Sequence, residues 1–134
     1  MRSQQTLPRL MMKNKGPSTT SIGQQAEEKA LHYLQKQGLT FWYKNYRKPG
    51  GELDLIMWQG PILVFVEVRY RRPQALVSAL ESITHTKLER IQNTANTFLT
   101  EHFSQANYPQ SRIDLVCVAR SQGTWHCTWL QNII

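Results

Sequence analysis

Acidic residues are scarce in this chain: its 134 residues include nine Asp and Glu against 16 Lys and Arg, a formal net charge of +7. Long apolar runs are absent too, and without about 18 consecutive apolar residues no membrane-spanning helix is expected. The beginning of the chain lacks the apolar core of a secretory signal. Only two cysteines are present, Cys117 and Cys127, and their spacing matches no metal site. Each lies in an apolar segment, so we expect buried free thiols in a cytoplasmic protein, with a disulfide as the alternative.

The excess of positive charge favours a polyanionic partner such as DNA. About half of this excess lies within the first twenty residues, which contain no acid. Its cations are Arg2, Arg9, Lys13 and Lys15. The segment has no apolar periodicity, so we expect residues 1–20 to form a disordered basic tail, which explains the charge almost as well as a DNA-binding surface does. Residues 21–134 are expected to form a single domain.

Apolar periodicity in that domain predicts an α/β fold. Helical spacing marks two segments, 22–37 and 84–102. Apolar runs rich in β-branched and aromatic residues mark five strands: 40–47, 52–58, 62–71, 113–120 and 124–130. Glycine-containing turns join the second strand to the third and the fourth to the fifth, so each of these pairs is expected to form a hairpin. Residues 73–82 are expected to be a loop with a short helical piece.

Several of the scarce acids interrupt apolar surfaces. Glu27 lies within the apolar stripe of the first helix, whereas Glu28 points to solvent. That stripe comprises Gly23, Ala26, Ala30, Leu31 and Leu34. The second helix is expected to bury Leu88, Ile91, Ala95, Phe98 and Leu99. Alternation along the second strand groups Glu52, Asp54, Ile56 and Trp58 on one face and Leu53, Leu55 and Met57 on the other.

Two carboxylates occupy neighbouring apolar strands, Asp54 on the second and Glu67 on the third. The expected hairpin places Asp54 near both Glu67 and Arg69. Buried carboxylates are costly unless a cation neutralises them. Asp54 and Glu67 therefore predict a site for a hard divalent cation, Mg²⁺ or Mn²⁺, which Glu27 could close from the first helix.

A structural ion-pair network is the alternative to a metal site. In such a network Glu67 would pair with Arg69 or Arg71, and Asp54 would pair with Lys87. A lone carboxylate in a strand is most often explained in this way. Three separate elements each contribute an inward acid here, and this combination favours the metal site.

The spacing of these residues resembles that of a nuclease superfamily. Asp54 followed by Glu67-Val68-Arg69 resembles the Asp…Glu-x-Lys signature of the restriction-endonuclease-like superfamily, and Gly23-x-x-x-Glu27 is similar to the first helix of its archaeal Holliday-junction resolvases. Roughly residues 21–120 more closely resemble the YraN family of bacterial proteins, whose endonuclease activity is inferred. The matching residues are Gly23, Glu27, Ala30, Leu34, Gly38, Asn45, Arg47, segments 51–56 and 65–71, Lys87 and segment 112–114.

The resemblance implies a restriction-endonuclease-like fold, with a mixed central sheet flanked by helices, and Mg²⁺-dependent hydrolysis of DNA phosphodiester bonds. Branched or otherwise processed DNA is a candidate substrate. The resemblance places Glu27, Asp54, Glu67 and Arg69 in the catalytic site, with the three acids around the metal. Arg69 departs from the usual lysine: arginine can hold a phosphate but is a poor proton acceptor. Further candidates for DNA contacts are Arg47, Lys48, Arg71, Lys87 and Arg90.

Two other functions remain open. The chain could be a catalytically silent nucleic-acid-binding or assembly module, which the arginine at position 69 favours. It could also be a structural interaction protein that uses the face of Trp125 and Trp129. The intact set of Glu27, Asp54 and Glu67 favours the nuclease. The sequence leaves both a monomer and a homodimer open.

Overall fold

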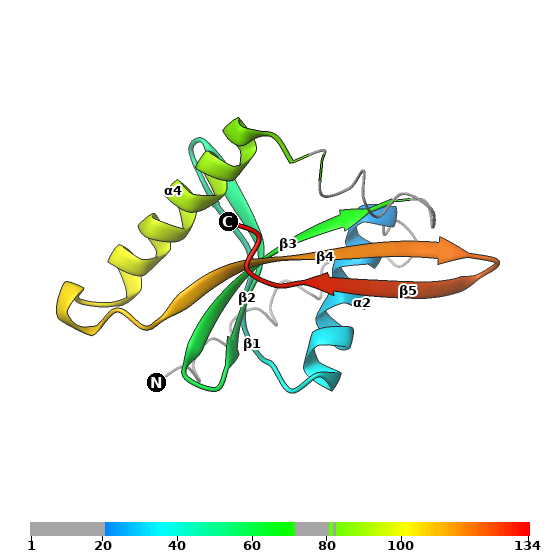
Figure 1. Cartoon of the computed structure of the whole chain (residues 1–134), viewed down its shortest axis with the longest axis horizontal. Helices are drawn as coiled ribbons and strands as arrows, with labels where there is room; N and C mark the ends of the chain where they lie inside the picture. The colour runs from blue at the N-terminus through cyan, green and yellow to red at the C-terminus, as the bar shows by residue number, and fades with distance from the viewer. Residues whose placement is uncertain (1–20, 72–80, 82) are drawn as a thin grey trace.

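The structure, a computed structural model, describes residues 21–71, 81 and 83–134 (Figure 1). The tail expected at residues 1–20 and most of the loop expected at 73–82 lie outside the described residues. In chain order the elements are α2 (Ile22–Lys36), β1 (Thr40–Lys48), β2 (Gly51–Gln59), β3 (Ile62–Tyr70), α4 (His85–His102), the 3₁₀ helix η2 (Gln105–Asn107), β4 (Ser111–Ser121) and β5 (Thr124–Leu130). The predicted helices and strands are all confirmed, and their ends differ from the prediction by at most two residues.

The five strands form one mixed sheet in the order β1-β2-β3-β4-β5. Neighbouring strands are antiparallel except for β3 and β4, which run parallel. Both predicted hairpins, β2–β3 and β4–β5, are confirmed. Parallel neighbours need a crossover connection, and α4 belongs to the segment that links β3 to β4 (Figure 1).

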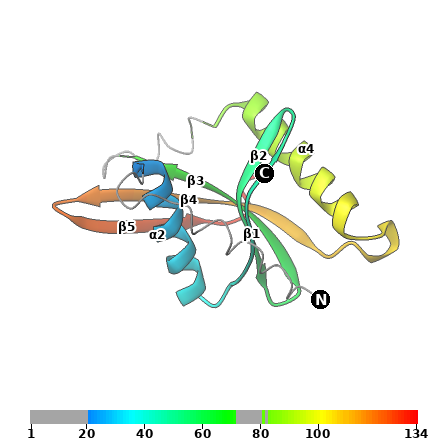
Figure 2. The ribbon, with the colours of Figure 1, turned by 180° about the vertical axis from the view of Figure 1, so that it is seen from behind.

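Of the two α-helices that the structure describes, one packs on each face of this sheet. Alternate residues of β3 separate two buried clusters: Val64 and Val66 pack with α2, and Leu63 and Phe65 pack with α4. Helix α2 crosses β3, β4 and β5, whereas α4 covers the part of the sheet near β2 (Figure 2). The α4 face of β3 beyond Phe65 is therefore the part of the sheet in which Glu67 lies.

Local capping explains where both helices begin. Ser21 and Gln24 form a reciprocal capping box at the start of α2, and the Thr84 hydroxyl accepts a hydrogen bond from the Lys87 backbone N–H at the start of α4. Helix α2 stops where Gly38 adopts a positive φ of 99°, a conformation that costs glycine little.

The buried faces of the helices depart from the expected stripes at four positions. Gly23 is exposed and Leu31 is only half-buried on α2, and Leu88 is only half-buried on α4. Thr94, which the sequence pattern assigned to no stripe, is buried on α4, where its hydroxyl donates a hydrogen bond to the Arg90 carbonyl. That bond satisfies the hydroxyl within its own helix, which is why a polar residue can occupy this buried position.

A fully buried aspartate fixes the end of the sheet. Both oxygens of Asp114 accept hydrogen bonds from Arg112 Nε, at 2.9 and 3.1 Å. The Trp129 Nε1–H and the Asn132 backbone N–H donate to the same carboxylate, at 2.9 and 2.8 Å. Trp129 also packs edge-on against Tyr33 of α2. These contacts give Trp129 a structural role at the β5–α2 contact.

Two expectations from composition also find support in the described residues. Cys117 and Cys127 are free thiols, which excludes the alternative of a disulfide between them; Cys117 is buried as expected, whereas Cys127 is only half-buried. Among the described helices, none is long and apolar enough to cross a membrane.

Gly51, at the start of β2, packs directly against α4. A Cβ at this position would overlap the Thr94 hydroxyl and lie 3.2 Å from the Arg90 carbonyl oxygen. We predict that Gly51→Ala destabilises the protein by about 1–3 kcal/mol, the usual cost of overpacking, as measured by urea unfolding. In the control Gly23→Ala, the new Cβ meets only the Ser21 hydroxyl at 3.8 Å. That control should be neutral or stabilising, and an equal loss in both variants would contradict the packing argument.

Candidate metal and phosphate site

The candidate site lies where β2 separates from β3. Regular pairing of these strands runs from Gln59↔Ile62 to Leu55↔Val66, and Asp54 and Glu67 come directly after it. Asp54 Oδ2 accepts a hydrogen bond of 2.8 Å from the Val68 backbone N–H. The Asp54 carboxylate thus takes the place of a backbone acceptor. It holds the two strands together where they separate, at Asp54 and Glu67, a place that we call the fork.

The same fork breaks the alternation expected along β2. Leu55 and Met57 pack in the α2 cluster, as expected of one face, but Leu53 packs with Ile56 in the α4 cluster. The prediction that Leu53 shares a face with Leu55 is therefore wrong. Its physical reason is local: strand alternation assumes regular pairing, but the pairing of β2 with β3 ends at Leu55, and its pairing with β1 skips Asp54.

Asp54 is buried without a neutralising cation. Its exposed fraction is 7%, and burial, together with the negative charge of Glu67, raises its pKa to about 8. The hydrogen bond from Val68 opposes this shift, whereas Glu27 and Glu52 add to it. No Lys, Arg or His among the described residues forms an ion pair with Asp54. Its charged form is thus unfavourable in the metal-free protein.

Glu67 is equally buried, with an exposed fraction of 6%, but it has two cationic neighbours. Arg69 Nε lies 3.3 Å and Lys87 Nζ 3.6 Å from the same oxygen, Oε2. The Arg69 contact is an ion pair only, because Arg69 Nε has no hydrogen-bond partner within the described structure. Burial nevertheless raises the pKa of Glu67, against the opposing effects of Lys87 and Arg69.

The ion-pair alternative is therefore only partly correct. Its pairing of Glu67 with Arg69 is confirmed. Its pairing of Asp54 with Lys87 is wrong, because Lys87 contacts Glu67 instead. Lys87 lies in the first turn of α4, and its side chain reaches Glu67 of β3 rather than Asp54 of β2.

Glu27 approaches the pair from α2. It is half-buried, whereas Glu28 is exposed, as the helical pattern predicts. Burial raises the pKa of Glu27, and nearby Lys44 and the Asn45 side chain oppose this shift. The sequence argument overlooked any site role for Asn45. Its positive φ of 54° is a conformation that asparagine tolerates, and an asparagine within a predicted strand was the available signal.

Glu52 is the fourth acid of this region. Its charge raises the pKa of Glu27, Asp54 and Glu67, so it lies close enough to interact electrostatically with all three. It is only partly buried, with 38% of its side chain exposed, and it pairs with Arg47 at 3.1 Å. Glu52 therefore lies at the rim of the site.

The carboxylates do not by themselves surround an ion. Within residues 21–71, 81 and 83–134, no three His, Cys, Asp or Glu side chains are close enough together to hold a metal. The chain brings together the pair Asp54 and Glu67, with Glu27 and Glu52 around it. Two carboxylates are a sufficient protein contribution for Mg²⁺, which keeps several waters and takes further oxygens from a substrate phosphate.

The residues predicted to contact DNA lie in different surroundings. Arg47 and Lys48 pair with acids: Arg47 with Glu52 at 3.1 Å, and Lys48 with Glu101 at 2.8 Å. Arg71 Nη1 donates to the Tyr70 carbonyl at 2.9 Å, and Arg90 is exposed on α4. Of these candidates, only Lys87 is in direct contact with the carboxylate pair.

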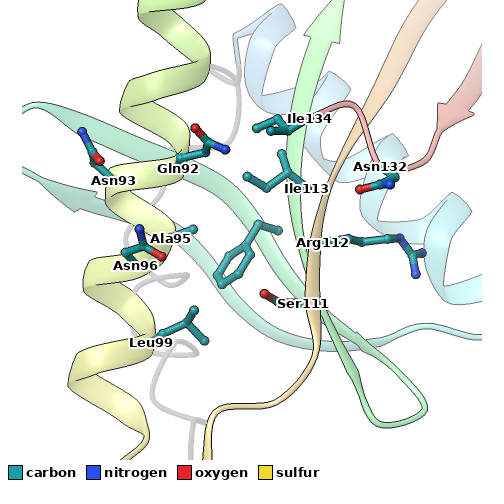
Figure 3. Close-up of a pocket in the computed structure, with 11 residues that line it drawn as sticks. Gln92, Asn93, Ala95, Asn96, Leu99, Ser111, Arg112, Ile113, Asn132 and Ile134 are labelled. Atoms are coloured by element: carbon teal, nitrogen blue, oxygen red, sulfur yellow. The ribbon is translucent and has the colours of Figure 1, made fainter. Parts of the chain in front are cut away.

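A separate hollow of about 410 Å³ lies between α4 and the beginning of β4 (Figure 3). Gln92, Asn93 and Asn96 of α4 line one side, and Ser111 and Ile113 line the other. None of Glu27, Asp54, Glu67 and Arg69 lines it. The candidate site and this hollow are therefore distinct places in the fold.

Comparison with known proteins gives a family. Residues 26–118 match the model of "Uncharacterised protein family UPF0102". The chain belongs to this family. It is 42% identical over 123 residues to a UPF0102 protein of Dichelobacter nodosus, covering 92% of this chain and 96% of that one. It is also 44% identical over 119 residues to a UPF0102 protein of Pseudomonas putida, covering 86% and 93% of the two chains. The resemblance to a YraN-like family is thereby confirmed at the level of the family.

The raised pKa of Asp54 in this UPF0102 member has a consequence for stability. A carboxyl whose folded-state pKa exceeds its unfolded value stabilises the fold below the unfolded pKa and loses that contribution as pH rises. The window here runs from the ordinary value of 3.8 to about 8. We predict that, in chelating buffer, the stability of wild type relative to Asp54→Asn falls across this window by more than about 1.4 kcal/mol, the equivalent of one pKa unit.

Urea unfolding at pH 4, 6 and 8 measures this difference. Glu28→Gln, which alters an exposed acid on α2, should show no such dependence. A wild-type advantage that grew with pH would mean that the charged form of Asp54 is favoured in the fold.

Proposed function

We propose that this protein is a Mg²⁺- or Mn²⁺-dependent endonuclease of the restriction-endonuclease-like type that hydrolyses DNA phosphodiester bonds. One observation carries the proposal: Asp54 is a buried carboxylate with a strongly raised pKa, it lies beside a second buried carboxylate, and no cation of residues 21–71, 81 and 83–134 forms an ion pair with it. A protein retains such an unfavourable charge most readily where a bound cation offsets it. The mixed sheet flanked by helices is compatible with this fold.

The donor set fits a hard divalent cation. Asp54 and Glu67 would hold it through carboxylate oxygens, the ligands that Mg²⁺ and Mn²⁺ prefer. When bound, such an ion supplies two effects, a lower pKa of a bound water and neutralisation of charge on the phosphate. The Val68 N–H fixes the Asp54 carboxylate in place. Glu27, half-buried on α2, would support this pair from the other side of the fork.

Arg69 contributes charge rather than proton transfer. Its guanidinium can hold a phosphate through two hydrogen bonds. Arg69 Nε already lies 3.3 Å from Glu67 Oε2, so the cation is next to the proposed metal ligand. A phosphodiester at the pair would meet this cation directly.

A catalytically silent DNA-binding module is the second candidate. Two observations favour it: Arg69 stands where the superfamily has lysine, and Glu67 has ion-pair partners of its own. In that case the fold would keep the charge pattern of the site without the reaction. The two candidates differ in whether the protein cuts DNA at all.

Cleavage of supercoiled, branched and single-stranded DNA with Mg²⁺ or Mn²⁺ tests the proposal. We predict metal-dependent cutting by wild type and a loss of at least about 100-fold in Asp54→Asn and in Glu67→Gln, because each removes a metal-binding charge. Glu28→Gln is the matched control and should cut like wild type. Absence of cutting with every substrate would favour the silent module, and cutting that survives both site substitutions would place the reaction elsewhere.

The two adjacent glutamates of α2 provide a second test. Glu27→Gln should reduce metal-dependent cutting about 10- to 100-fold, the range typical of groups that support metal ligands. Glu28→Gln should leave cutting unchanged, because its side chain is exposed. Equal effects of the two substitutions on the cutting rate would show that Glu27 plays no part in the site.

A further inference from the structure

Lys87 reaches the carboxylate pair from outside the sheet. It lies in the first turn of α4, and its backbone N–H is fixed by the Thr84 cap at 3.1 Å. Its Nζ lies 3.6 Å from Glu67 Oε2. The helix cap therefore sets the point from which this flexible side chain extends toward β3.

Two cations compete for a single oxygen of Glu67. Arg69 is on the same strand, two residues further along, and 22% of its side chain is exposed. Lys87 is on another element, and 35% of its side chain is exposed. Lysine also has a compact charge on a flexible four-carbon stem, whereas arginine is a planar and less adaptable group. Lys87 is therefore the cation that can leave Glu67 without rearrangement of a strand.

We propose that Lys87 is an exchangeable cation of this site: it neutralises Glu67 while no divalent ion is bound and moves to a phosphate oxygen of DNA when the ion occupies Glu67. This inference rests on the proposed function. Lys87 of α4 would then supply the lysine that the superfamily has at the position of Arg69 in β3. Arg69 remains beside Glu67 in both states.

The electrostatics of the pair support this exchange. In the free protein Lys87 and Arg69 share Glu67, and Asp54 has no cation among the described residues. A divalent ion between the two carboxylates would interact with both, so it would outcompete a single ammonium group for Glu67. The displaced Lys87 would then lie next to the place where a phosphate meets the ion, and opposite charge would draw it there.

Metal binding without DNA tests the first half of the exchange. Removal of a competitor should lower the Mn²⁺ concentration that half-saturates the rise in melting temperature, by about 3- to 10-fold in Lys87→Met. Lys87→Arg keeps the positive charge beside Glu67 and should therefore not show this gain in Mn²⁺ affinity. Lys36→Met removes the same charge from an exposed position on α2 and should behave like wild type. If Lys87→Met does not fold, Lys87→Gln takes its place.

DNA binding tests the second half. This measurement uses Ca²⁺, a hard cation that takes the same oxygen ligands. The slope of the logarithm of the DNA-binding constant against the logarithm of the salt concentration should become shallower by about one in Lys87→Met, the contribution of one phosphate contact. Without a divalent ion the slope should match wild type, because Lys87 is then held by Glu67. Lys36→Met should not alter the difference between the two conditions.

The outcomes separate the two proposals. Unchanged Mn²⁺ affinity in Lys87→Met, or a slope equally altered with and without Ca²⁺, overturns the exchange while metal-dependent cutting by wild type still supports the nuclease. A wild type that neither responds to Mn²⁺ nor cuts DNA overturns both. If Lys87→Met shows both expected changes and wild type binds metal and DNA without cutting, the exchange is supported and the protein is a silent module.

Discussion

The hydrogen bond from the Val68 N–H to Asp54 is the interaction on which the candidate site depends. It holds β2 and β3 together at the point where their backbone pairing ends, and it fixes the Asp54 carboxylate close enough to Glu67 for the charge of Glu67 to raise its pKa. The bond occupies part of the hydrogen-bonding capacity of the carboxylate, which leaves acceptor sites open. It also fails to balance burial, since the pKa of Asp54 remains raised to about 8. The fork thus combines a fixed Asp54 carboxylate with unfavourable charge, which is why it is the candidate for a cation site.

A second aspartate in the same sheet shows what a purely structural carboxylate looks like here. Asp114 is more deeply buried than Asp54, yet it accepts hydrogen bonds from Arg112, Trp129 and Asn132. Its charge is neutralised by an adjacent guanidinium and its oxygens are occupied. Asp54 has one backbone donor and acidic neighbours. The contrast in partners, rather than burial itself, distinguishes the functional candidate from the structural residue.

The sequence predicts the strands, the helices and the inward direction of Glu27 because each depends on local periodicity. It also predicts the closeness of Asp54 and Glu67, since a short turn joins their strands. The position of Leu53 could not be predicted, because it depends on where pairing stops. The contact between Lys87 and Glu67 could not be predicted either, because the angle at which α4 crosses the sheet is set by packing, including the close approach of Gly51 to Thr94. Long-range geometry of this kind leaves no local pattern.

The parallel pairing of β3 with β4 has a consequence for the order of folding. Leu63 pairs with Ser111, 48 positions further along, whereas the two hairpins pair through short turns. Closing a long loop carries a larger entropic cost, so the hairpins can form before β3 pairs with β4. Glu67 of β3 pairs with Leu115 of β4, and its burial is completed only when β4 joins the sheet. The connecting segment carries Lys87. The step that buries this charge is therefore the same step that delivers a cation to it.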